Sequence, residues 1–292
     1  MLNLLIFGLL VALGPPIGAQ DAGSAVTEKE LRETFREDYA STDEAVRAEA
    51  ITALSDSSRA LPDGGSSKML ARTFASAMKS DKSPAVRAAA AGALAWGRHV
   101  ETSIDAMSDM LHEMSKLSAK LSTRPDEASR TQRRQATQLY TQLCQALSRH
   151  PDDRALKALK DELKKQRPRS GSGSASVEFV RPLSTALLQL GSQEAVECVV
   201  STTAVFSGSA LVNNGGTARG LHEALAAYSE EVGYGSAAFS DRYDQLWRKW
   251  LKEHKRELPP KLGKLKDPVE APEYRANNRS RDRQRPGERE RP

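Results

Sequence analysis

The sequence of 292 residues is poor in aromatic residues and in cysteine. Phe, Trp and Tyr make up only 5% of it, too little for a β-sandwich core of aromatic and β-branched strands, whereas Ala is abundant in the first half. This composition favours closely packed helices. Neither Cys144 nor Cys198 has a second cysteine at metal-ligand spacing, which excludes a local thiolate metal site. Both lie in apolar helical contexts, which predicts either two buried thiols or a single disulfide.

Local catalytic and metal-binding motifs are also lacking. The five histidines are scattered singly, and there is no HExxH, no Gly-x-Ser-x-Gly, no phosphate-binding glycine loop and no Asp-rich calcium loop. His99 near Trp96 and His254 near Trp250 are typical of surface or interface histidines rather than of general bases. We therefore predict a protein that is not an enzyme and has no cofactor or metal. A site assembled by the fold from distant residues stays the third-ranked alternative.

Only one apolar run stands out, and it lies at the N-terminus. It extends from Met1 to Leu13, stops at Gly14-Pro15-Pro16 and is followed by the small residue Ala19. This order predicts a signal peptide over residues 1–19 and a periplasmic or secreted protein. The run is shorter than the roughly 20 apolar residues of a membrane span, so no transmembrane segment is expected after signal removal. Because no Lys or Arg precedes the run, a buried N-terminal helix or an uncleaved anchor is the alternative.

The strongest internal signal is a repeat with an offset of 40 residues. The segments AVRAEAITAL (45–54) and AVRAAAAGAL (85–94) match at seven of ten positions. In each copy the apolar residues fall on one helical face, and they are Val46, Ala50, Ala53 and Leu54, then Val86, Ala90, Ala93 and Leu94. Such a helix cannot bury its stripe alone, so further units are expected to stack on it.

The pattern Asp/Ser-(Glu/Pro)-Ala-Val-Arg-x-x-Ala-x-x-Ala-Leu within residues 43–56 and 81–97 resembles the second helix of HEAT repeats, including HEAT-like repeats of the phycobilisome-lyase type. Residues 179–200 resemble the end of one repeat helix, a Gly-containing turn and the start of the next. The resemblance implies a right-handed α-solenoid of stacked antiparallel helix pairs. In that family the Arg after Val commonly bonds the turn before its helix, so Arg47 and Arg87 are expected to be fold residues.

Helical periodicity predicts further elements within an array over residues 25–258. Apolar residues of 102–121 fall on one face, and a helix over 127–147 completes a helical hairpin. The methionines of the first helix suit either core or an adaptable binding surface, and core is the predicted use. Residues 155–166 form another amphipathic helix. The Gly/Ser-rich segment 167–176 predicts an exposed loop or a linker.

The last predicted helix starts near Ser240 and carries Tyr243, Trp247 and Trp250 on one face. The two tryptophans are expected to close the core at the end of the array, or alternatively to form an aromatic binding surface. Beyond it the composition changes to Lys, Pro and Arg with little apolar content. This change predicts a disordered basic tail over residues 259–292.

The net charge of +5 is located in the C-terminal part of the chain. Residues 252–292 contain 13 basic and 8 acidic residues, a surplus equal to the charge of the whole chain. Arginines pair well with phosphate and carboxylate groups. Acids are interleaved with them, and no aromatic residue follows Tyr274 to stack on bases, so nucleic acid is not the expected partner.

These observations lead to a non-catalytic protein–protein interaction scaffold in the cell envelope or extracytoplasmic space. The alternative is a tethering protein that holds an anionic polymer or a lipid head group through its tail. The candidate binding residues are Trp247, Trp250, Arg279, Arg281, Arg283 and Arg285.

If the N-terminal segment is a cleaved signal, the mature protein begins near Gln20. N-terminal sequencing of the exported fraction checks this. Retention of Met1 on soluble cytosolic protein would contradict it.

Overall fold

The computed structural model describes residues 27–61, 66–124, 126–166, 177–207, 215–231 and 243–262. Within these ranges the chain forms eleven α-helices, one 3-10 turn and no strand, which confirms the predicted all-α class. The predicted signal peptide (1–19) and the Gly/Ser-rich segment (167–176) lie outside the described residues.

The helices follow one another along the chain, and the connections that lie within the described residues are short. Their bounds are α1 (Glu28–Tyr39), α2 (Glu44–Arg59), α3 (Lys68–Ser80), α4 (Pro84–Ala95), α5 (Val100–Leu121), α6 (Glu127–Ser148), α7 (Asp153–Lys165), α8 (Val177–Leu190), α9 (Gln193–Ser207), α10 (Gly215–Glu231), α11 (Tyr243–His254) and the 3-10 turn η2 (Lys255–Glu257). The predicted hairpin of residues 102–121 and 127–147 is confirmed as α5 and α6.

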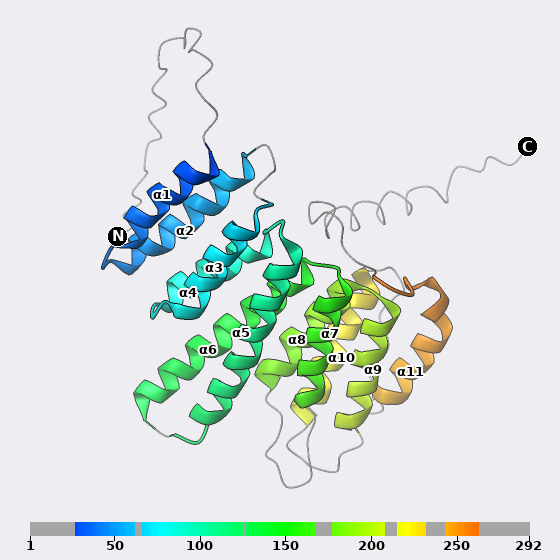
Figure 1. The fold of residues 1–292 in the computed structure, drawn as a ribbon. Helices are drawn as coiled ribbons and strands as arrows, with labels where there is room; N and C mark the ends of the chain where they lie inside the picture. The colour runs from blue at the N-terminus through cyan, green and yellow to red at the C-terminus, as the bar shows by residue number, and fades with distance from the viewer. Residues whose placement is uncertain are drawn as a thin grey trace, which may run out of the picture.

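The helices are arranged in two rows (Figure 1). The even-numbered helices from α2 to α10 pack against one another in chain order, and the odd-numbered helices from α3 to α11 do the same. Most consecutive helices also pack together, among them α1 with α2, α3 with α4, α5 with α6 and α9 with α10. One hydrophobic core runs between the rows, from Phe35 in α1 to Leu258 beyond α11.

Side chains and special backbone positions set the helix ends. Asp43, Ser83 and Asp126 accept hydrogen bonds from backbone N–H groups in the first turns of α2, α4 and α6. Pro84 occupies the first turn of α4, where the missing N–H is harmless. Gly191 has a φ of 65°, a left-handed conformation that suits glycine, and it supplies the turn between α8 and α9.

The two copies of the 40-residue repeat are buried unequally. All of the second stripe is buried, at Val86, Ala90, Ala93 and Leu94. In the first copy Ala50 and Leu54 are buried, but Val46 is 39% exposed and Ala53 is also exposed. The reason is position in the row, because α4 lies between α2 and α6 whereas α2 has α4 alone as an even-numbered neighbour in the described chain.

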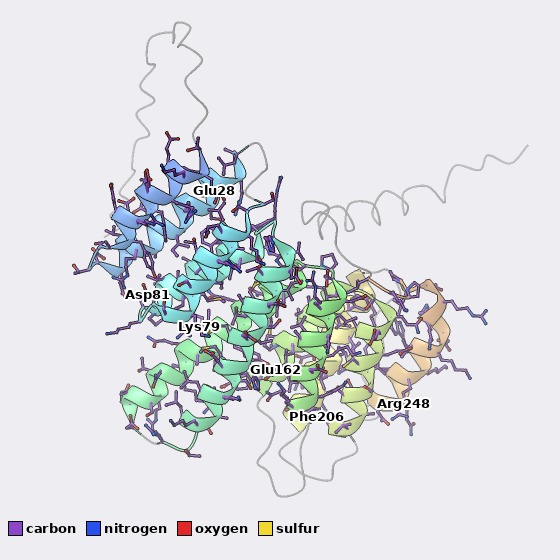
Figure 2. All side chains as sticks on the ribbon, viewed as in Figure 1. Glu28, Lys79, Asp81, Glu162, Phe206 and Arg248 are labelled. Carbon is purple, nitrogen blue, oxygen red and sulfur yellow. The ribbon has the colours of Figure 1, made fainter. Side chains whose placement is uncertain are left out.

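Arg47 joins the first helix pair to the second. Its Nη1 donates to the backbone carbonyls of Ser41 and Thr42 at 3.0 Å, so it bonds the turn before its own helix. Its guanidinium also grips Asp81 at two points, with Nε–Oδ2 at 2.9 Å and Nη2–Oδ1 at 3.1 Å. The Tyr39 hydroxyl donates to the same Oδ2 at 2.9 Å. Asp81 lies where α3 ends, beside the first helix pair (Figure 2).

Arg87 has the equivalent position in α4 but different partners. Its Nε donates to the backbone carbonyl of Met78 at 3.0 Å, near the end of α3. Its Nη2 lies 3.0 Å from the Met110 sulfur of α5. Burial lowers the pKa of Arg87. Arg47 thus bonds the connection before its helix, whereas Arg87 bonds the last turn of the preceding helix α3. Within the described residues, only Arg47 of the two binds a carboxylate.

The packed chain continues past the expected start of the tail. The N–H of Gln193 donates to the carbonyl of Pro259 at 2.8 Å, Leu258 is buried and Leu262 packs against the core. The predicted boundary at residue 259 therefore falls inside a packed segment, and residues 263–292 lie outside the described chain. A truncation that spares these contacts starts at residue 263.

Cys144 and Cys198 are both buried and are not joined in a disulfide. Burial raises the pKa of the Cys144 thiol well above its usual value. None of the described helices combines the length and the apolar composition needed to cross a bilayer.

Replacing Val86 with Asp should destabilise the protein by about 4 kcal/mol, since it places an unpaired charge in a fully buried site. Val46→Asp is a matched control at the same helical position in the exposed copy, and it should change stability by less than about 1 kcal/mol. Chemical denaturation checks both variants. Equal losses would show that α4 is no more buried than α2.

Asp81→Asn should destabilise the protein by about 2 kcal/mol near neutral pH, because Arg47 loses its charged partner. The hydrogen bonds from Arg47, aided by those from the Ser83 N–H and Tyr39, lower the pKa of Asp81 from 3.8 to about 2. The stabilisation by the ionised carboxylate is therefore complete above pH 3.8 and lost as the pH falls through about 2. Denaturation of wild type and variant at several pH values should show the two converging, with exposed Asp38→Asn as control. A constant gap down to pH 2 would contradict this.

Candidate functional site

The two tryptophans predicted on the last helix lie inside the protein. Trp247 is 0% exposed and Trp250 is 7% exposed, and their rings meet edge to face at 5.6 Å. The Trp247 indole N–H donates to Nδ1 of His222 in α10 at 3.1 Å, and burial lowers the pKa of that histidine. Both rings thus pack in the core beneath α11, and neither offers a broad surface to a partner.

The candidate arginines of the tail are Arg279, Arg281, Arg283 and Arg285, and all four lie outside the described residues.

Trp96, by contrast, is 47% exposed. It caps the C-terminal end of α4, where the chain turns directly into α5. Gly97 makes this turn tight, because a Cβ there would lie 2.8 Å from the Ser103 hydroxyl and 3.2 Å from the carbonyl oxygen of Leu94. The close approach keeps Trp96 at the edge of the helix row and leaves part of its indole in solvent.

Two arginines from the neighbouring helices lie against the Trp96 ring. The guanidinium carbon of Arg149 is 4.1 Å from the ring centroid, and that of Arg59 is 5.4 Å away. Arg59 is the last residue of α2, and Arg149 caps α6. The C-terminal ends of three adjacent even-numbered helices therefore assemble one aromatic and cationic cluster, in which the ring quadrupole attracts both cations.

A buried histidine holds two of these helix ends together. His150 follows Arg149 directly and is 1% exposed, and its Nε2 lies 3.2 Å from the carbonyl oxygen of Leu94. Burial lowers the pKa of His150, so the neutral ring donates its Nε2–H to that carbonyl. This bond joins the end of α6 to the end of α4 and so positions Arg149 beside Trp96.

A shallow hollow opens beside the indole. Its accessible volume is about 10 Å³, room for about one water molecule, and it is lined by Ser55, Ser58, Arg59, Leu70, Ala71, Phe74, Ala93, Trp96, Gly97, Arg98 and His99. The lining combines core residues, among them Leu70, Phe74 and Ala93, with polar and cationic ones. We call Arg59, Trp96, Arg98, His99 and Arg149 the Trp96 surface.

The two arginines beside Trp96 differ in their other contacts. Arg59 lies 3.6 Å from a carboxylate oxygen of Asp56 and 3.4 Å from the Ser55 hydroxyl. Arg149 forms no ion pair with any residue in the described part of the chain. Arg154, five positions further on, is paired with Asp152 at 3.0 Å and with Glu101 at 3.4 Å. Arg149 is thus an exposed cation with a ring contact and with no carboxylate of the described chain within ion-pair distance.

The other conspicuous polar cluster surrounds Glu162, between α5 and α7 (Figure 2). This carboxylate is 2% exposed and accepts from Lys165 at 3.2 Å and Gln166 at 3.3 Å, with His112 at 3.4 Å. Both of its oxygens have partners, so the cluster ties α7 to α5. Across the described ranges, no three His, Cys, Asp or Glu side chains are placed to hold a metal ion.

The Trp96 surface was missed by reasoning from the sequence, which noted Trp96 only as a neighbour of His99. A weak local signal exists, since Trp96 directly follows the apolar stripe of a repeat helix and precedes a glycine. Its two arginines are 37 and 53 residues away in the chain, and no local pattern joins them.

No family model and no curated protein matches this chain.

Proposed function

We propose that the protein is a non-catalytic scaffold that holds a protein partner, and that the Trp96 surface is a docking site. The observation that carries this proposal is a half-exposed tryptophan whose ring lies close to two arginine guanidinium groups. Trp and Arg are the residue types that most often dominate binding energy at protein interfaces. A half-exposed indole also has apolar surface that a partner can bury, which favours binding.

The proposed architecture is a right-handed α-solenoid of HEAT-like repeats. Three features support it: the 40-residue repeat of α2 and α4, the packing of alternate helices in two rows, and the hydrogen bonds from Arg47 and Arg87 to backbone carbonyls shortly before each repeat helix. Stacked helix pairs form an extended surface, which suits a scaffold because many shallow contacts can be distributed along it.

We further propose that the scaffold works outside the cytoplasm, in the periplasm or after secretion, as the signal-like N-terminus favours. A second function is supported by the location of charge, because the surplus of 5 lies within residues 252–292. In that case the tail binds an anionic polymer or lipid head group, and the helical body only carries it.

Replacing Trp96 with Ala should weaken partner binding about 30-fold, the effect of losing roughly 2 kcal/mol at a central interface residue. The measurement is affinity capture from the native envelope, with wild type, Trp96→Ala, Val46→Ala and a deletion of residues 263–292. Val46→Ala is the matched control, since Val46 is also exposed but lies at the opposite end of α2 from Arg59.

Wild type, Val46→Ala and the truncated protein should capture the same partner, and Trp96→Ala should lose it while keeping its helical circular dichroism. Capture by Trp96→Ala at the wild-type level would refute the docking site. Loss of capture by the truncated protein alone would assign binding to the tail.

A further inference from the structure

We infer that the partner docks on the Trp96 surface through a peptide segment in which an Asp or Glu carboxylate pairs with Arg149 and an adjacent apolar side chain packs on the exposed part of the Trp96 indole. This inference rests on the proposed function and names the chemistry of its partner.

Arg149 is an exposed cation. Its guanidinium carbon lies 4.1 Å from the Trp96 ring centroid, and no described carboxylate lies within ion-pair distance. A guanidinium carries several N–H donors in a planar fork, which can bind a carboxylate at two points. Arg149 is therefore available to an anion that the described protein does not itself supply.

Both arginines lie at helix C-termini. A basic residue there can simply complement the helix dipole and donate to the last carbonyls. In the described structure, however, Arg59 donates to the Ser55 hydroxyl, and neither arginine is bonded to a terminal carbonyl. Both guanidiniums lie against Trp96 instead. The indole, rather than the helix ends, determines where these cations lie.

The exposed part of the Trp96 indole offers an apolar contact. Trp96 is 47% exposed, whereas the hollow beside it has an accessible volume of only about 10 Å³ and is too small for a side chain. The nearby Ser58 hydroxyl already has a partner, since it donates to the carbonyl of Ser55 at 2.8 Å. An apolar group that packs on the indole removes water from both surfaces.

The charges around the Trp96 surface favour a peptide over a polyanion such as nucleic acid. Positive charge is local, because Asp56 neighbours Arg59, and Arg154 is already paired with Asp152 and Glu101. The carboxylates of Asp56 and Glu101 are exposed and would repel a long polyanion that extended beyond Arg149. The ring of Trp96 is also occupied by guanidinium groups, which hinders the stacking of bases that single-stranded nucleic acids use. A segment with one carboxylate avoids both problems.

The test is selection of random 12-residue peptides displayed on phage, with the purified full chain as bait, followed by affinity measurement on the selected synthetic peptides. The baits are wild type, Trp96→Ala, Arg149→Glu and Arg36→Glu. Arg36 is the matched control, since it is an exposed arginine at the end of α1 that makes no ion pair with a described residue. Thermal melting of each variant shows that it is folded.

Wild type and Arg36→Glu should select peptides with Asp or Glu beside an apolar residue. Arg149→Glu should bind those peptides at least about tenfold more weakly, the effect of replacing attraction by repulsion at one charged contact, and should instead select peptides with Lys or Arg. Trp96→Ala should bind neither class.

Peptides that depend on Trp96 but lack an acidic residue, and that bind Arg149→Glu as well as wild type, would overturn the inference and leave the proposed docking site intact. The same peptides selected by wild type and Trp96→Ala would overturn both. Tight binding of a single-stranded dT oligonucleotide that is lost in Arg149→Glu would overturn the peptide and assign the surface to a polyanion.

Discussion

The structure depends on one constraint, which is that no single helix of this chain can bury its own apolar stripe. Stripes rich in Ala let neighbouring helices approach closely, but each stripe needs a helix on both sides. The two repeat copies show the effect directly. Val86 is fully buried in α4, which has neighbours on both sides in its row, and the equivalent Val46 in α2 is 39% exposed. Burial is thus a property of place in the row as well as of sequence, and the Arg47–Asp81 contact fixes the spacing of the first two pairs.

The same constraint creates the Trp96 surface. Helices that pack in one row and alternate with antiparallel partners all run in the same direction, so their C-terminal ends meet at one edge. Arg59, Trp96 and Arg149 each stand at such an end, and the bond from His150 to the Leu94 carbonyl fixes two of the ends together. A cluster built in this way needs no loop of its own and moves with the rigid helices that carry it.

Much of the helical pattern could be predicted from the sequence, because long amphipathic stretches have a strong period. The hairpin α5–α6 lies within two residues of its expected bounds, and the turn expected before α9 contains Gly191 in the left-handed conformation. The site could not be predicted. The sequence of a helix does not show whether an aromatic residue on one of its faces lies in the core or on the surface. The helices that pack beside it in the fold determine its burial. Trp247 and Trp250 lie in the core, whereas Trp96, outside any stripe, is exposed beside cations from two other helices.

The packing of Arg149 on Trp96 also bears on how tightly a partner could be held. A free arginine loses about 2 kcal/mol of rotamer entropy when it is fixed in an interface. Here contact with the indole already restricts the guanidinium before a partner binds, and the buried side chain of His150 restricts the backbone next to Arg149. Part of the ordering that binding requires is therefore complete in the unbound protein. An exposed ion pair in water contributes little by itself, so this preorganisation and the exposed indole supply the basis for affinity, while the carboxylate supplies selectivity.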